Sequence, residues 1–330
     1  MSEKSFKTDV VIIGAGPVGL FAVFELGLLD IKCHLIDILE VVGGQCSELY
    51  PEKPIYDIPA IPVCTGQELT DKLMAQIEPF DPYFHLGQMA ESISKKEDGN
   101  WVVKTDLGTV IEARVIVVAA GGGSFVPKKP PLKGLEEFEG KSVFYSVKRM
   151  EDFRDKNILI AGGGDSALDW SIFLADVASK VTLIHRRNEF RGALDSVEKV
   201  KELKDLGKIN LITPAEVIGV GGKGTLELLT IQQGEETLDI KTDAFIPLFG
   251  LSPKLGPIAN WGLEIEKNAI KVDNTLDYQT NVPGIYAIGD VNTYPGKLKL
   301  ILSGFHEGAL AARACFKLAR PNEKYRFEFT

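Results

Sequence analysis

Two glycine-rich turns, 148 residues apart, constrain this 330-residue chain more than any other feature. The first reads Gly14-Ala15-Gly16-Pro17-Val18-Gly19 and the second reads Gly162-Gly163-Gly164-Asp165-Ser166-Ala167. Apolar segments typical of buried strands, 9–13 and 157–161, precede the turns, and helical patterns follow both. A strand, a glycine turn and a helix in this order can bind a pyrophosphate on the free N–H groups of the helix N-terminus. The repeat therefore predicts two dinucleotide sites in one chain.

An acidic residue supports this interpretation of the first turn. A second strand-like segment, Cys33 to Ile36, ends at Asp37, which lies 23 residues after Gly14. A carboxylate at this position can accept hydrogen bonds from the ribose of an adenosine. An ordinary strand–turn–helix connection is the alternative interpretation.

The corresponding strand end after the second turn is basic. Residues 181–184 are followed by His185-Arg186-Arg187-Asn188-Glu189-Phe190-Arg191, with three arginines where the first site has an acid. Guanidinium groups bind a 2′-phosphate through charge-assisted hydrogen bonds, whereas a carboxylate would repel it. The segment therefore predicts NADP(H) and not NAD(H) at the second site. A solvated basic patch at a strand end is the alternative.

The order of elements predicts an α/β fold of two Rossmann-like three-layer (ββα) dinucleotide-binding domains, one inserted into the other. After the first turn come a helix near 67–77, antiparallel strand candidates at 87–95, 101–106 and 110–112, and a buried strand at 115–119. Clusters of glycine and proline at 121–131 and 250–253 mark two crossings between domains. The expected first domain is 1–124 with 250–330, including a strand over 285–290 and a helix over 300–318. The expected second domain is 125–249, with a helix over 165–178.

Composition limits the classes of function. Hydrophobic residues make up 45% and charged residues 25%, as in soluble globular proteins, and no apolar run reaches the roughly 18 residues of a membrane span. The N-terminal segment lacks a signal-peptide pattern, so we expect a cytoplasmic protein. Four cysteines without metal-ligand spacing predict buried thiols and no metal site, and a net charge of −9 argues against nucleic acid as the partner.

These motifs, together with Gly43–Cys46 (GGQC) and Tyr286–Asp290 (YAIGD), resemble the thioredoxin-reductase-like branch of the two-dinucleotide flavoproteins over nearly the whole chain. The resemblance implies FAD at the first site and NADP(H) at the second. Thioredoxin reductase carries a redox CxxC about 17 residues before the second glycine turn, where this chain has Tyr145-Ser146-Val147-Lys148. Without thiols there, an internal dithiol relay is excluded. The chain is more similar to the ferredoxin/flavodoxin–NADP⁺ reductases of this type, including at 45–53 and 301–305.

The resemblance implies two sets of binding residues. The expected FAD residues are Gly14, Gly16, Pro17, Gly19, Asp37, Gly44, Gln45, Tyr50, Ala120, Phe125, Gly289, Asp290 and Ser303. The expected NADP(H) residues are Gly162, Gly164, Asp165, Ser166, Ala167, His185, Arg186, Arg187 and Arg191. Tyr50 would stack on the flavin; its alternative is an ordinary turn tyrosine before Pro51. The N-terminus of the final helix would point at the pyrimidine end of the flavin ring, and hydride transfer requires no acid–base residue, so His306 has no assigned role.

The implied partners are ferredoxin or flavodoxin and a second copy of the chain, with Phe327 or Phe329 covering the flavin of the other subunit. An acidic carrier would need a basic face, for which the candidates are Lys128, Lys129, Lys297, Lys299, Arg313, Lys317 and Arg320. The main alternative is an NADPH-dependent reductase of another acceptor, such as an external disulfide protein, a quinone or oxygen. A non-catalytic redox-sensing flavoprotein is more distant, and a flavin monooxygenase lacks its FxGxxxHxxxW-type linker here.

Overall fold

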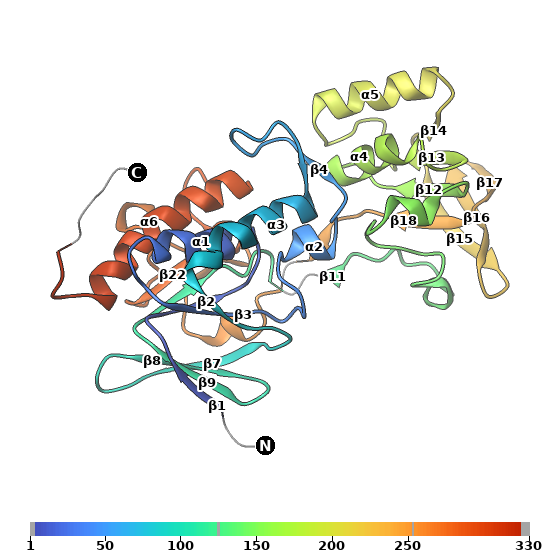
Figure 1. Cartoon of the computed structure of the whole chain (residues 1–330). Coiled ribbons are helices and arrows are strands. Elements are labelled where there is room, and N and C mark those ends of the chain that lie inside the picture. Colours follow the sequence, from blue (N-terminus) through green and yellow to red (C-terminus); the bar gives the residue numbers. More distant parts are fainter. Residues whose placement is uncertain (1–3, 124–125, 253, 325–330) are drawn as a thin grey trace. The chain divides into compact units, whose positions relative to one another are not determined.

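The computed structural model describes residues 4–123, 126–252 and 254–324, and every statement below concerns these residues. The chain divides into two compact units (Figure 1), residues 1–125 with 253–330 (unit 1) and residues 126–252 (unit 2). The predicted α/β fold, with one dinucleotide-binding unit inserted into another, is confirmed.

Unit 1 is built on a five-stranded parallel sheet in the order β22-β10-β2-β3-β6. Its two central strands, β2 and β10, are buried at every position, as expected for parallel strands covered on both faces. The bounds are β22 Ile285–Ala287, β10 Val115–Val118, β2 Val10–Ile13, β3 Cys33–Ile36 and β6 Tyr83–His85.

Two further layers cover this sheet (Figure 1). Helices α1 (Pro17–Gly27), α3 (Gly66–Ile77) and α6 (Ile301–Ala319) lie on one face. The other face carries a second sheet, β1 (Lys4–Lys7), β9 (Thr109–Ala113), β8 (Trp101–Thr105) and β7 (Ala90–Lys95), antiparallel except for the β1–β9 pair. Smaller elements are α2 (Gln45–Glu48), β4 (Pro54–Ile55), β5 (Cys64–Thr65), β20 (Ile265–Glu266), β21 (Ala269–Lys271) and β23 (Asn292–Thr293).

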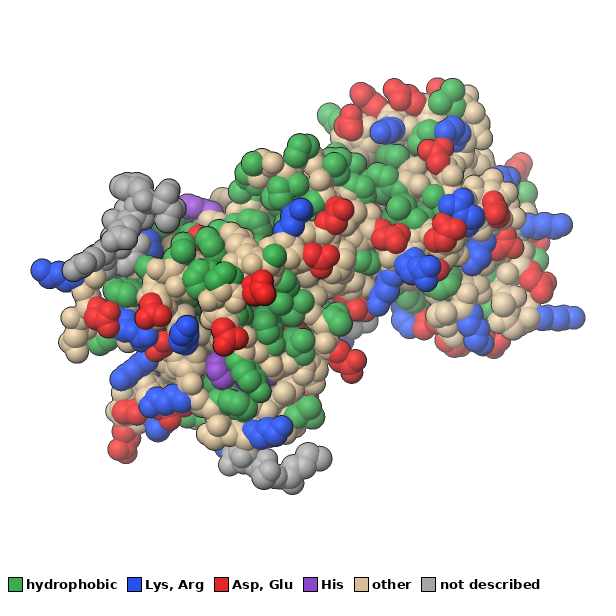
Figure 2. Space-filling model, in the orientation of Figure 1, with side chains coloured by type: hydrophobic (Ala, Val, Ile, Leu, Met, Phe, Trp, Pro, Cys, Tyr) green, Lys and Arg blue, Asp and Glu red, His purple; other side chains and the backbone are tan. Residues whose placement is uncertain are grey.

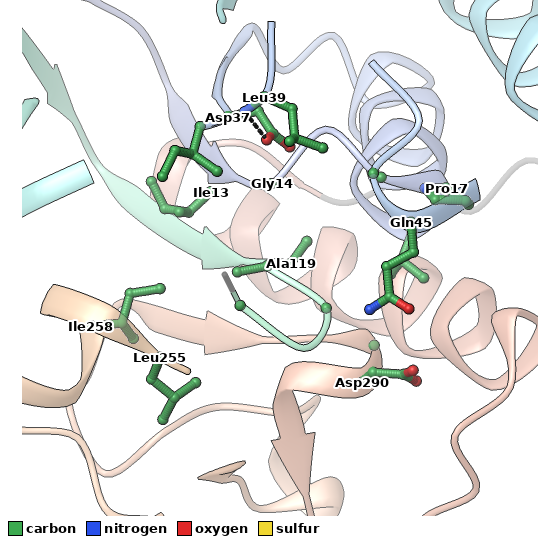
Figure 3. A pocket seen from close by; sticks show the side chains of 18 of the residues that line it. Ile13, Gly14, Pro17, Asp37, Leu39, Gln45, Ala119, Leu255, Ile258 and Asp290 are labelled. Atoms are coloured by element: carbon green, nitrogen blue, oxygen red, sulfur yellow. Dashed lines mark hydrogen bonds between the residues drawn. The ribbon is translucent and has the colours of Figure 1, made fainter. Parts of the chain in front are cut away.

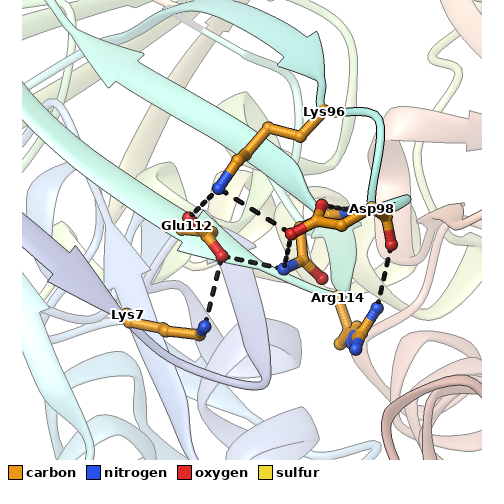
Figure 4. Close-up of polar contacts among 6 residues, drawn as sticks. Lys7, Lys96, Asp98, Glu112 and Arg114 are labelled. Atoms are coloured by element: carbon orange, nitrogen blue, oxygen red, sulfur yellow. Dashed lines mark hydrogen bonds and ion pairs between the residues drawn. The ribbon is translucent and has the colours of Figure 1, made fainter.

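A charged cluster at the edge of the second sheet is structural. Glu112 of β9 accepts from Lys96 Nζ at 2.8 Å and from Asn100 Nδ2 at 2.8 Å, and its Oε1 lies 3.3 Å from Lys7 Nζ (Figure 4). The Lys96 hydrogen bond holds the pKa of Glu112 down at about 2. Because Lys7 and Lys96 are largely exposed, the cluster joins neighbouring strands but contributes little stability.

Unit 2 repeats the plan with a four-stranded parallel sheet, β14-β13-β12-β18, helices α4 and α5, and an antiparallel sheet, β15-β16-β17. Leu229 and Ile231 of β16 share a buried cluster with Leu159 and Phe245 of the parallel sheet. The bounds are β14 Ile209–Ile212, β13 Lys180–Ile184, β12 Asn157–Ala161, β18 Ala244–Pro247, α4 Asp165–Leu174, α5 Leu194–Asp205, β15 Glu216–Gly222, β16 Leu226–Gln233 and β17 Glu236–Lys241, with the short pair β11 Val126–Pro127 and β19 Leu251–Ser252.

Three predicted elements were too long. The strand expected over 87–95 begins at Ala90, after a turn at Leu86 and Gly87. The helix expected over 165–178 ends at Leu174. The N–H groups of Val177 and Ala178 both donate to the Leu174 carbonyl, at 3.1 and 2.9 Å, and form a turn from which the chain enters β13. The strand expected over 285–290 ends at Ala287, because Gly289 has a φ of +77° and begins a 3₁₀ turn.

The four cysteines are free and buried, as predicted. Within the described ranges, none of the helices has the length and apolar character that a membrane crossing needs. Among the same residues, no group of three or more His, Cys, Asp or Glu side chains is arranged to hold a metal ion.

Candidate cofactor-binding site

A pocket of about 440 Å³ opens in unit 1 at the carboxyl ends of its central parallel strands (Figure 3). Ile13, Ile36 and Ala119 contribute its floor at the ends of β2, β3 and β10. Ligands of open α/β sheets bind at this edge, where the strand order reverses. The volume and the largely apolar lining are those of a cofactor site.

Two glycines of the first turn are required by the protein itself. Gly14 has a φ of +112°, and a Cβ there would lie 2.4 Å from the carbonyl oxygen of Ala119. A Cβ on Gly19 would lie 2.0 Å from the carbonyl oxygen of Gly14. These glycines allow α1 to pack tightly beside the ends of β2 and β10.

Gly16 has no such internal reason to be glycine. Its φ is an ordinary −75°, and an added Cβ would meet only the Gly44 Cα, at 3.8 Å. Gly16 is the N-cap of α1, and no side chain caps this helix start. The first N–H groups of α1 therefore lack a side-chain acceptor beside an open pocket wall, which fits a pyrophosphate.

Asp37, at the end of β3, accepts hydrogen bonds from the backbone of the same turn and of the segment that follows β3. Its Oδ2 accepts from the Ala15 N–H at 2.7 Å. Its Oδ1 accepts from the Leu39 N–H at 2.9 Å (Figure 3). Burial raises the pKa of this carboxyl, and the backbone donors oppose that rise. Because each carboxylate oxygen has two acceptor sites, Asp37 retains capacity for ribose hydroxyls.

The far end of the pocket combines an aromatic ring, a carboxylate and a helix start. Tyr50 lines the wall, and its hydroxyl accepts from the Cys46 thiol at 3.8 Å. Burial raises the pKa of Cys46 to about 11, so this thiol is protonated at neutral pH. Asp290 lines the wall near α6, whose N-cap, Leu300, supplies no side-chain cap.

The second glycine turn, in unit 2, has the same division of roles. A Cβ on Gly162 would lie 2.7 Å from the Leu248 carbonyl oxygen, and a Cβ on Gly163 would lie within 2.5 Å of three His185 ring atoms. A Cβ on Gly164 would meet nothing within 4 Å. Gly164 is the N-cap of α4, again without a side-chain cap, so the helix start is available to an anion.

The basic segment folds back onto this turn. The Arg191 N–H donates to the Gly163 carbonyl at 2.7 Å, and the His185 ring stacks on Phe190 with centroids 5.3 Å apart. Burial lowers the pKa of His185, so the ring is neutral at pH 7. Arg186, Arg187 and Arg191 are exposed, so their guanidinium groups are available to a phosphate near the turn.

Known protein families, relatives and solved structures agree with this geometry. The model of the pyridine nucleotide-disulphide oxidoreductase family matches residues 8–308. The chain belongs to that family.

Relatives and solved structures refine the match. A Christiangramia forsetii protein named ferredoxin–NADP reductase 1 is 62% identical, and a Flavobacterium johnsoniae protein named ferredoxin–NADP reductase is 63% identical; each match covers 98% of this chain and 93% of the relative. Lactococcus lactis thioredoxin reductase superposes with a TM-score of 0.81 at 25% identity, over 94% of this chain and 99% of that one. T. acidophilum thioredoxin reductase superposes with a TM-score of 0.81 at 24% identity, over 94% of this chain and 98% of that one. The predicted resemblance is confirmed.

Most residues predicted for the first site of this oxidoreductase line one pocket. These are Gly14, Gly16, Pro17, Asp37, Gly44, Gln45, Tyr50, Ala120, Gly289 and Asp290. Gly19 packs behind the turn, Ser303 is half-buried on α6 but does not line the pocket, and Phe125 lies outside the described residues. Of the second set, Ala167 is buried below the glycine turn, whereas Asp165 and Ser166 are exposed at the start of α4.

Several lining residues were not predicted. Leu39, Met89, Leu255 and Ile258 contribute apolar surface, and Lys299 lies at the rim before α6. Most of these positions carry no local motif, because the pocket forms only when segments distant in the sequence come together. The one available signal was at Leu39, an apolar residue two positions after Asp37.

The predicted basic face is partly wrong. Lys297 is only 6% exposed and pairs with Glu307, and Arg320 forms a two-point pair with Asp9 at 2.6 and 2.9 Å. Lys128 and Lys129 belong to unit 2, and Lys129 pairs with Glu139 at 2.6 Å. Lys299, Arg313, Lys317 and also His306 are exposed in unit 1. On the face seen in Figure 2, basic and acidic side chains are interspersed.

Proposed function

We propose that this chain is a ferredoxin–NADP⁺ reductase, with FAD in the unit 1 pocket and NADP(H) at the glycine turn of unit 2. One observation carries the proposal: two glycine turns, each leading into a helix without a side-chain cap, occur in a chain whose four cysteines are all buried and free. The names of relatives 62% and 63% identical over nearly the whole chain support it. When bound, FAD accepts a hydride from NADPH and delivers electrons singly to a one-electron carrier.

The residues of unit 1 fit FAD. Gly16 and the uncapped start of α1 would receive the pyrophosphate, and Asp37 would accept from the adenosine ribose. Tyr50 would lie against the flavin ring, held by the Cys46 thiol. Asp290 and the uncapped start of α6 would contact the remaining polar edge. The protein thus binds, orients and shields the cofactor, and no side chain needs to move a proton.

A disulfide acceptor within the chain does not fit. Burial raises the pKa of Cys33 to about 12 and of Cys46 to about 11, and it raises the pKa of Cys64 and Cys315 as well. The thiolate is the reactive form of cysteine, and the raised pKa of each thiol disfavours that form at neutral pH. The electrons must therefore leave to an external acceptor, for which a small one-electron protein is the best match to a flavin.

Unit 2 would discriminate between the two nicotinamide cofactors. The exposed Arg186, Arg187 and Arg191 would bind the 2′-phosphate, and Gly164 would let the pyrophosphate approach α4. The proposal includes flavodoxin as a second carrier, a homodimer and a cytoplasmic location. These three parts rest on the resemblance and composition, and the rings proposed to cover the flavin, Phe327 and Phe329, lie outside the described residues.

Anaerobic stopped-flow of the purified yellow protein tests this function. NADPH should bleach the flavin absorbance rapidly, and NADH should bleach it at least ten-fold more slowly. Mixing with ferredoxin or flavodoxin coupled to cytochrome c should then give acceptor-dependent turnover. Bleaching without electron transfer to either carrier would contradict ferredoxin and flavodoxin as the acceptors and would favour an external disulfide protein or a quinone. No bleaching by NADPH would overturn the proposal as a whole.

A further inference from the structure

A fully buried carboxylate lies behind the pocket. Glu307 of α6 is 0% exposed, and its two oxygens accept four hydrogen bonds. Its Oε2 accepts from the Gly289 N–H at 2.7 Å and from Asn292 Nδ2 at 2.8 Å, while its Oε1 accepts from the Tyr294 hydroxyl at 2.8 Å and from Lys297 Nζ. A buried charge is tolerated only when its acceptor sites are filled, and here they are.

Lys297, the cation that forms an ion pair with Glu307, is buried as well. The Lys297 side chain is 6% exposed, and its Nζ donates to the Gly289 carbonyl at 2.9 Å in addition to Glu307. The ion pair therefore forms hydrogen bonds with both backbone polar groups of Gly289: Glu307 accepts from its N–H, and Lys297 donates to its C=O.

Gly289 is the residue that places Asp290. Its φ of +77° turns the chain sharply after β22, and the next side chain, Asp290, lines the pocket. A Cβ on Gly289 would approach Val18 of α1 at 3.3 Å, so the turn also abuts the first glycine helix. Holding Gly289 rigidly fixes the Asp290 carboxylate with respect to the pyrophosphate cradle.

The position of the pair is unusual within unit 1. Lys96–Glu112 has a similar short contact, 2.8 Å, but its side chains are 46% and 21% exposed. A well-packed apolar pair usually stabilises a core at least as well as a buried ion pair does. Fold stability alone therefore gives no reason for opposite charges at this place, whereas a charge-sensitive ligand in front of them does.

We propose that Lys297 and Glu307 are positioning residues of the cofactor site: they clamp the Gly289–Asp290 turn against FAD, and their opposite charges set its midpoint potential. This inference rests on the proposed function, since it requires FAD in the unit 1 pocket. Neither residue touches the pocket surface, so both act through Gly289, Asp290 and the electric field behind them.

Three variants of the FAD-loaded protein test the inference: Glu307→Gln, Lys297→Met and the double variant. Gln at 307 leaves the Lys297 cation uncompensated, which favours the reduced flavin and raises the midpoint potential. Met at 297 leaves the carboxylate uncompensated and lowers it. We expect at least a ten-fold change in the redox equilibrium in each direction, about 30 mV for a two-electron couple, with the double variant returning toward wild type. FAD affinity should fall at least ten-fold in all three.

Two controls accompany these measurements. Glu112→Gln breaks an exposed pair of the same chemistry in the same unit, and it should change neither the potential nor the FAD affinity. Lys297→Arg keeps the charge and should retain the wild-type potential even where FAD affinity falls. If Lys297→Met does not fold, Glu307→Gln with Lys297→Arg still separates charge from packing.

The results distinguish this inference from the proposed function. Wild-type protein that does not bind FAD would overturn the proposed function. Wild-type protein that binds FAD and reduces ferredoxin, with variants of unchanged potential, would overturn only the inference. Potentials that shift in one direction in all three variants would show general loosening of the site and would also contradict it.

Discussion

The two glycine turns share a backbone plan but differ in their surroundings. The turn in unit 1 opens on a largely apolar pocket of about 440 Å³, with its acid, Asp37, fastened by two backbone donors. The turn in unit 2 lies beside a segment with three exposed arginines. A largely apolar pocket suits a resident cofactor, whereas an exposed charged site suits a nucleotide that must bind and leave in each cycle. The surroundings of the two turns therefore predict a different role for each.

Within each turn, the glycines also divide into two kinds. Gly14 and Gly162 exclude a Cβ because backbone carbonyls lie 2.4 and 2.7 Å from its position. Gly16 and Gly164 have room for a Cβ within the protein itself. The first kind is required by folding, and we expect the second to be required by the ligand, a distinction that substitutions can test.

The largest expected effect is that of Gly14→Ala. The new Cβ would clash with the Ala119 carbonyl at a φ of +112°, so we expect a loss of about 3 to 5 kcal/mol in the free energy of unfolding. Gly99→Ala is the matched control, because Gly99 also has a positive φ but nothing within 4 Å, and it should cost about 1 kcal/mol. Urea unfolding measures both, and equal losses would contradict the close approach of the turn to β10.

The next effect concerns the arginines beside the glycine turn of unit 2. Arg186→Ala combined with Arg187→Ala should lower the preference for NADPH over NADH by at least about a hundred-fold, since each of the two charge-assisted phosphate contacts is worth about 1.5 to 3 kcal/mol. The ratio of kcat/KM for the two cofactors measures this preference, and FAD content should not change. An unchanged ratio would show that these arginines form only a solvated surface.

Acid should weaken the unit 1 site through a buried histidine. His85, 4% exposed and bonded to His34 at 3.0 Å, has its pKa lowered to about 4 by burial and by His34. Between pH 6.5 and 4 the unfolded chain binds more protons than the folded chain, so stability falls as pH falls. The His85 carbonyl accepts from the Asp37 N–H at 3.1 Å, which links this strand to the pocket.

The expected loss from this histidine is about 2 kcal/mol between pH 7 and pH 5. Unfolding of unit 1, followed by flavin release at saturating FAD, should show this slope in wild type and a smaller slope in His85→Gln. Identical slopes in the two proteins would exclude His85 as the source.

The smallest effects separate the two sites most cleanly. Gly16→Ala should weaken FAD binding about ten-fold, and Gly164→Ala should raise the KM for NADPH about ten-fold, because each methyl occupies space that a pyrophosphate needs. Neither should lower the unfolding free energy of the apoprotein by more than about 0.5 kcal/mol, since neither Cβ meets a protein atom closer than 3.8 Å. A raised KM for NADPH in Gly16→Ala, or weaker FAD binding in Gly164→Ala, would contradict the assignment of FAD to unit 1 and NADP(H) to unit 2.

Much of the fold could be predicted because its signals are local. The apolar runs at 10–13 and 115–118 became fully buried parallel strands, and the glycine turns appeared between strand and helix in both units. The end of α4 and the 3₁₀ turn at Gly289 could not be predicted, because the return to β13 and the packing against Val18 set them. Lys297 shows the same limit: a lysine in a polar stretch suggests a surface, and only the fold pairs it with Glu307.

The sequence by itself determined the repeated strand–turn–helix unit, the acid at one strand end, the arginines at the other and the absence of a CxxC motif. Each of these depends on residue type and spacing within one segment, so no partner is needed to recognise it. Only the tertiary structure decided that Leu39, Met89, Leu255 and Ile258 share one pocket, and that Glu307 lies buried behind Asp290. These residues come from segments up to about 270 positions apart, as with Leu39 and Glu307, and their contacts exist only after the parallel sheet brings its strand ends to a common edge.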